Sequence, residues 1–167
     1  MTFLSSNQLK QYEDEGFVSP INIFSNMKAK EIRDEIELIE KKMPNELIKS
    51  GRYNAHLISP LLDEVTHNQD VLDAVESIIG NNILVCGTTL FIKNPGEGGF
   101  VSYHQDAKYI GLEPHNWVTA WVAITNSDEN NGCMKMWSGS HKENLKEHDQ
   151  NFNEKNLLTR GQTINNV

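Results

Sequence analysis

The chain has 167 residues, a formal net charge of -8 and a pI near 5.2, and it is long enough for one domain with a sizeable core. We expect no nucleic-acid partner, because phosphate binding needs clustered Lys and Arg that this acidic chain lacks. No apolar run approaches the roughly 18 residues of a membrane span, and no secretion signal opens the chain, so we expect a cytoplasmic protein without a membrane partner.

Residues 1–80 are predicted to form a mainly helical flank. Ser5 or Ser6 can cap a helix over 7–15, which Gly16 closes. A longer helix is predicted over 26–43, because apolar residues recur there at intervals of three and four. Its apolar stripe consists of Ile32, Ile36, Ile39 and Met43.

Two further helices are predicted before Gly80. Ser59 can cap one that has Pro60 in its first turn, and Asn68 can cap another over 69–79. The apolar residues of the second of these should face a sheet. These helices are therefore expected to cover one layer of a mixed fold.

After Gly80 the pattern changes to short segments rich in β-branched and aromatic residues, separated by Gly, Pro and Asn. The predicted strands are 83–86, 88–93, 100–104, 117–124 and 133–137. The turn residues between them favour antiparallel connections, as in a sandwich or jelly roll. Helices followed by strands predict an α+β fold in one domain over 1–167.

His104 and Asp106 are the most informative residues of this chain. They stand two apart at the end of a predicted strand, so both side chains can point to one side and share a metal ion. An imidazole and a carboxylate on one face suit ferrous iron, which then keeps positions open for a 2-oxo acid and dioxygen. The spacing alone is weak, since His141 and Glu143 repeat it, and a surface His bonded to an Asp is the simpler alternative.

The surrounding blocks add weight to this pair. In order they are Leu90-Phe91-Ile92-Lys93-Asn94-Pro95, His104-Gln105-Asp106, Thr119-Ala120-Trp121-Val122-Ala123, Asn131-Gly132-Cys133-Met134 and Gly139-Ser140-His141. Together they resemble the phytanoyl-CoA dioxygenase family of Fe(II)- and 2-oxoglutarate-dependent oxygenases. The segments Leu9 to Val18 and Asp73 to Gly80 resemble it as well, so the likeness covers most of the chain.

The resemblance implies a double-stranded β-helix, or jelly roll, behind N-terminal helices. It implies that His104 and Asp106 bind Fe(II), and that a small organic substrate is hydroxylated while 2-oxoglutarate becomes succinate and carbon dioxide. The positions that match its 2-oxoglutarate pocket are Thr89, Lys93, Gln105 and Trp121. For Trp121 a core aromatic, and for Lys93 a solvated ammonium, are the alternatives from residue type alone.

The family pattern continues to a distal histidine and an arginine that have no matching position here. We therefore expect an incomplete oxygenase domain, with 81–167 as the first part of the jelly roll and the later strands missing. With two protein ligands and no arginine for the cosubstrate, such a chain should be weakly active or inactive.

Two other functions stay open at this point. The chain could be a binding or assembly module that keeps the fold without catalysis. It could also be a cupin-like or zinc enzyme that recruits His141 or His148 as a further ligand. The primary substrate and the oligomeric state are not predicted.

Overall fold

The structure is a computed structural model that describes residues 3–44, 53–158 and 163–164. Its contacts divide the chain into two compact units. Unit 1 consists of Met1–Leu90 and Val118–Gly139, and unit 2 consists of Phe91–Trp117 and Ser140–Val167. No helix among the described residues is long and apolar enough to cross a membrane.

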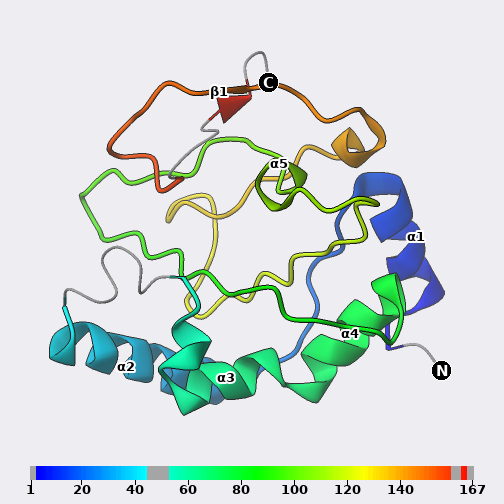
Figure 1. The fold of residues 1–167 in the computed structure, drawn as a ribbon. Helices are drawn as coiled ribbons and strands as arrows, with labels where there is room; N and C mark the ends of the chain where they lie inside the picture. The colour runs from blue at the N-terminus through cyan, green and yellow to red at the C-terminus, as the bar shows by residue number, and fades with distance from the viewer. Residues whose placement is uncertain (1–2, 45–52, 159–162, 165–167) are drawn as a thin grey trace. The chain divides into compact units, whose positions relative to one another are not determined.

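Unit 1 begins with helix α1, Ser6–Glu15, which starts and stops as its residue types dictate (Figure 1). The Ser5 side chain accepts a hydrogen bond from the Gln8 amide, and Gln8 bonds back to the Ser5 amide. This reciprocal pair satisfies two amides that a helix start leaves unbonded. Gly16 ends α1 with φ +84°, a conformation that costs glycine little.

Helix α2, Asn26–Lys42, confirms most of the predicted apolar stripe. Ile32, Ile36 and Ile39 are buried along one face. Met43 was expected to continue the stripe, but it lies just beyond the helix end and is partly exposed. The buried stripe therefore ends at Ile39, one member short of the predicted four.

Three more helices follow in the described part of unit 1. They are the short 3-10 helix η1, Ala55–Leu57, then α3, Pro60–Thr66, and α4, Gln69–Ile79. Ser59 and Asn68 cap α3 and α4 as predicted, and Gly80 follows α4. Helix α3 contacts both α2 and α4, and η1 packs against α3 (Figure 1). In α4 Ala74 is buried, whereas the larger apolar side chains are only half-buried.

The predicted jelly roll is absent from the described residues. None of the five segments predicted as strands forms one there, and Figure 1 draws the chain between α4 and α5 without a helix or a strand. Only isolated bridges occur in them, one between Tyr53 and Thr89 and one between Phe100 and Asn156. A strand exists only through hydrogen bonds to a neighbour, so residue preference without such a ladder leaves an extended loop.

Unit 2 contains the one described sheet, which pairs β1, His148–Asp149, with β2, Thr163–Ile164. The pairing is antiparallel, with His148 opposite Ile164. The helix α5, Ala107–Ile110, and the 3-10 helix η2, Ser140–Lys142, also belong to this unit. The chain is thus helical with a small sheet, an α+β fold in a coarse sense only.

Candidate metal centre

The segment that carries His104 is held at its start by backbone hydrogen bonds. The Phe100 amide donates to Lys155 O at 3.0 Å, and the Leu157 amide donates to Phe100 O at 2.8 Å. The Ile164 amide donates to Tyr103 O at 3.1 Å, which joins this segment to β2. The approach to His104 is therefore fixed by contacts with residues 55 to 61 positions later in the chain.

The side chains of His104 and Asp106 lie next to each other. Nε2 of His104 is 3.1 Å from Oδ1 of Asp106, with side-chain exposures of 22% and 43%. The two residues were expected to converge through strand alternation, but the local geometry differs. Asp106 has helical backbone angles and opens α5, so a turn of the chain brings the carboxylate back toward the imidazole.

The other ring nitrogen of His104 fixes the orientation of the imidazole. Nδ1 lies 2.8 Å from the Ser102 carbonyl oxygen, which can only accept a hydrogen bond, so Nδ1 carries a proton. Nε2 then faces Asp106. Histidines that bind metals are commonly held this way, with the remote N–H donated to a backbone carbonyl.

The pKa of His104 reflects two opposing effects. Burial of the ring lowers it, but the hydrogen bond to Asp106, the Ser102 carbonyl and the negative charge of Asp106 raise it by more. The net result is a pKa above the ordinary value of 6.5. Nε2 and Oδ1, which face each other in this contact, are also the two atoms that a metal cation would attract.

The donor pair fits two adjacent positions of an octahedral metal ion. For metal–ligand bonds of about 2.1 Å, ligands at right angles stand about 3.0 Å apart, close to the 3.1 Å between Nε2 and Oδ1. A nitrogen and a carboxylate oxygen are also the donor types of the 2-His-1-carboxylate iron site. A third ligand is not in place, since the described residues contain no group of three His, Cys, Asp or Glu suited to a metal.

Gln105 and His148 form a clamp beside this pair. The Gln105 amide donates to Nε2 of His148 at 2.9 Å, and the Lys146 amide donates to Oε1 of Gln105 at 2.7 Å. Tyr109 lies edge-on to both His104 and His148, with ring centroids 5.7 and 6.4 Å away. Gln105 was expected to line the cosubstrate pocket, and in the structure its side-chain oxygen bonds to the backbone at Lys146.

The remaining predicted pocket residues fall in both units. Thr89 and Trp121 belong to unit 1, where both are exposed, and Thr89 forms the bridge to Tyr53. Lys93 belongs to unit 2 and is also exposed. Within unit 2, the structure brings together the predicted residues His104, Gln105 and Asp106.

The structure places His148 and Tyr109 beside this pair, whereas the sequence offered His148 only as a further ligand in the cupin-like or zinc alternative. No local signal marks His148, because its contact with Gln105 joins residues 43 positions apart. Its pKa is lowered by burial and by the charges of Lys108 and His104, although the Lys146 carbonyl partly opposes this.

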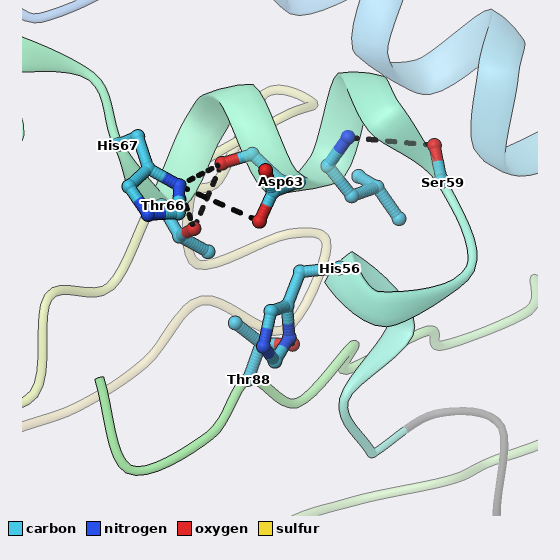
Figure 2. Close-up of polar contacts among 7 residues, drawn as sticks. His56, Ser59, Asp63, Thr66, His67 and Thr88 are labelled. Carbon is cyan, nitrogen blue, oxygen red and sulfur yellow. Dashed lines mark hydrogen bonds and ion pairs between the residues drawn. The ribbon is translucent and has the colours of Figure 1, made fainter.

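Unit 1 has a second polar cluster, which Figure 2 shows around α3. His67 Nδ1 lies 3.4 Å from Asp63 Oδ1 and also contacts Thr66. His56 Nδ1 lies 2.8 Å from the Thr88 hydroxyl. The His67–Asp63 pair spans one helical turn, with side-chain exposures of 67% and 50%, which makes it a more exposed contrast to His104 and Asp106.

Comparisons with known proteins identify the family of this chain. The profile of the Phytanoyl-CoA dioxygenase (PhyH) family matches residues 12–164. The chain is 31% identical to the peroxisomal phytanoyl-CoA dioxygenase of Bos taurus, over 87% of this chain and 50% of that protein. It is 28% identical to phytanoyl-CoA dioxygenase of Arabidopsis thaliana, over 86% and 50%.

A bacterial relative broadens the comparison. The probable alpha-ketoglutarate-dependent hypophosphite dioxygenase of Stutzerimonas stutzeri is 24% identical, over 86% of this chain and 56% of that protein. The chain spans about half the length of the curated relatives it matches. No solved structure gives a significant match.

These likenesses are to 2-oxoglutarate-dependent dioxygenases. Since the profile match runs over most of the sequence, the chain belongs to the phytanoyl-CoA dioxygenase (PhyH) family.

Proposed function

We propose that this chain supplies the iron-binding segment of an Fe(II)- and 2-oxoglutarate-dependent dioxygenase that hydroxylates a small organic molecule. The 3.1 Å approach of His104 Nε2 to Asp106 Oδ1 carries the proposal. The family match over 12–164 supports the same chemistry. By itself the chain is expected to have weak activity or none, because two protein ligands hold an ion less firmly than three.

His104 and Asp106 would hold the metal in this proposal. Bound ferrous iron would supply the redox chemistry that couples oxidation of 2-oxoglutarate to hydroxylation of the substrate. The Ser102 carbonyl keeps the His104 ring turned so that Nε2 faces the carboxylate. Asp106 adds a negative charge that attracts a cation, and its partial exposure leaves a route from solvent to the site.

We propose a role in binding 2-oxoglutarate for the positions that match the cosubstrate residues of the family, which are Thr89, Lys93, Gln105 and Trp121. An ammonium such as that of Lys93 can attract a carboxylate, and a hydroxyl such as that of Thr89 can donate to one. The substrate itself stays a broad class. One relative is named for a CoA thioester and another for hypophosphite, so membership of the family does not select one compound.

Replacement of Asp106 tests the proposal. Asp106→Ala should weaken binding of Co(II), used as a stable substitute for Fe(II), by about tenfold or more, because one of two ligands is lost. Isothermal titration of the 167-residue chain measures this affinity. Asp63→Ala is the matched control, since it removes the acid of the exposed His67–Asp63 pair and should leave the affinity unchanged.

Equal Co(II) affinity in Asp106→Ala and in the parent chain would rule out the site. Elemental analysis of the purified protein addresses the zinc alternative. Retained zinc, together with no response of metal binding to added 2-oxoglutarate, would favour a different metal enzyme.

A further inference from the structure

His148 is a buried histidine with both ring nitrogens hydrogen-bonded. It is 6% exposed and lies in β1, opposite Ile164 of β2. Nδ1 lies 3.0 Å from the Lys146 carbonyl oxygen, and Nε2 lies 2.9 Å from the Gln105 amide. A carbonyl oxygen can only accept a hydrogen bond, and a backbone N–H can only donate one. Nδ1 therefore carries the proton, and Nε2 accepts the hydrogen bond from Gln105. The two contacts therefore select one neutral tautomer.

Gln105, whose amide donates to His148, lies between the two proposed metal ligands in the sequence. Gln105 joins His104 to Asp106, and a rotation of its peptide would move both side chains. The bond from the Lys146 amide to Gln105 Oε1 adds a second attachment from the same segment. Two hydrogen bonds of opposite direction thus tie Gln105 to residues 146–148.

We propose that His148 is a positioning residue for the metal site, which keeps His104 Nε2 and Asp106 Oδ1 adjacent by accepting a hydrogen bond from the Gln105 amide. The inference rests on the proposed function, in which those two atoms bind the ion. His148 does not act as a ligand, because a ligand nitrogen needs a lone pair and the only one on its ring is taken by Gln105. The same argument removes His148 from the zinc alternative.

Three substitutions separate positioning from ligation and from general packing. In His148→Gln the side-chain oxygen can reach the place of Nε2 and accept from Gln105. In His148→Asn the oxygen reaches only the place of Nδ1, and in His148→Leu no acceptor remains. Partners of metal ligands typically change metal affinity by about 10- to 100-fold. We expect the Co(II) affinity of His148→Asn and His148→Leu to be about tenfold lower than that of the parent chain. The affinity of His148→Gln should stay within about threefold of the parent value.

A second measurement needs no metal. Nuclear Overhauser contacts between the His104 ring and the Asp106 side chain should persist in His148→Gln and disappear in His148→Asn and His148→Leu. His67→Leu is the control, because it removes an exposed histidine of unit 1 and should change neither measurement.

The outcomes distinguish this inference from the proposed function. Parent-like Co(II) affinity and parent-like contacts in His148→Asn would overturn the positioning role, as would a loss in His148→Gln equal to that in His148→Asn. If the parent chain binds no Co(II), the proposed function fails, and the contacts in the metal-free variants still decide whether His148 positions the pair. If His148→Leu does not fold, the comparison of Gln with Asn carries the test.

Discussion

The two His–Asp pairs of this protein show how surroundings set the character of the same two groups. His67 and Asp63 lie one helical turn apart and are well exposed, so solvent screens their attraction. His104 and Asp106 are closer together, and the His104 ring is more buried and is oriented by the Ser102 carbonyl. Only the second pair therefore combines the donor types, the separation and the fixed ring that a metal site requires.

The raised pKa of His104 predicts a pH effect on stability. A histidine whose pKa is higher in the folded state stabilises the fold fully below its unfolded pKa, near 6.5, and this contribution is lost as the pH rises through the folded pKa. In an NMR titration, the ring of His104 should have its midpoint above 6.5. Asp106→Asn should lower that midpoint, because burial of the ring lowers its pKa and no ionised carboxylate would then oppose this effect.

The corresponding control is Asp63→Asn, which should leave the titration of His104 as it is in the parent chain. A midpoint that does not respond to Asp106→Asn would show that the carboxylate is not the cause of the shift.

At the scale of elements, helices were predicted well and strands were not. The ends of α1, α3 and α4 follow from caps and stops that act within four residues, as with Ser59 and Gly16. A strand depends on partners far along the chain. The residues around Thr89 and Phe100 have a strong preference for strands, yet Thr89 and Phe100 each form a single isolated bridge.

Helix α2 offers a direct test of its buried face. Ile32 is 1% exposed and Leu38, on the same helix, is 42% exposed. Ile32→Ala should lower the free energy of unfolding by about 2 to 5 kcal/mol, because it removes buried methyl groups and leaves a cavity. Leu38→Ala should change it by about 0.5 kcal/mol or less. Urea unfolding followed by circular dichroism measures both.

A similar loss of stability in the two variants would contradict the assignment of the buried face. The comparison is well matched, because both substitutions remove an aliphatic side chain from the interior of one helix and differ mainly in burial.

At the scale of the whole molecule, many large apolar side chains stay exposed. Those of unit 1 that follow α4 are Leu84, Val85, Trp121, Met134, Met136 and Trp137, and Leu84 is 90% exposed. Exposed apolar surface of this kind favours association with other apolar surfaces. These residues lie in segments that were predicted to be strands of an incomplete jelly roll.

We therefore expect the isolated chain to self-associate. Sedimentation velocity over a range of concentrations should show an average mass that rises with concentration, and Leu84→Lys should reduce the rise by adding charge at the most exposed site. A concentration-independent monomer with one sharp unfolding transition would contradict this expectation. Asn81→Lys, which adds the same positive charge at an exposed polar residue, controls for net charge.

The sequence by itself determined the features that depend on near neighbours. The helices α1 to α4, the caps of α1, α3 and α4, and the His104–Asp106 motif were predicted from residues within a few positions of one another, because capping and side-chain spacing act over that range. The family resemblance was likewise carried by short blocks in a fixed order.

Only the tertiary structure decided which distant residues meet. It placed His148 on the Gln105 amide across 43 positions, and it left the predicted strands without the ladders that would define them. Both results have one physical reason. A contact between distant residues forms only when the rest of the fold offsets the entropy of closing the loop between them, and residue preferences do not reveal which loops close.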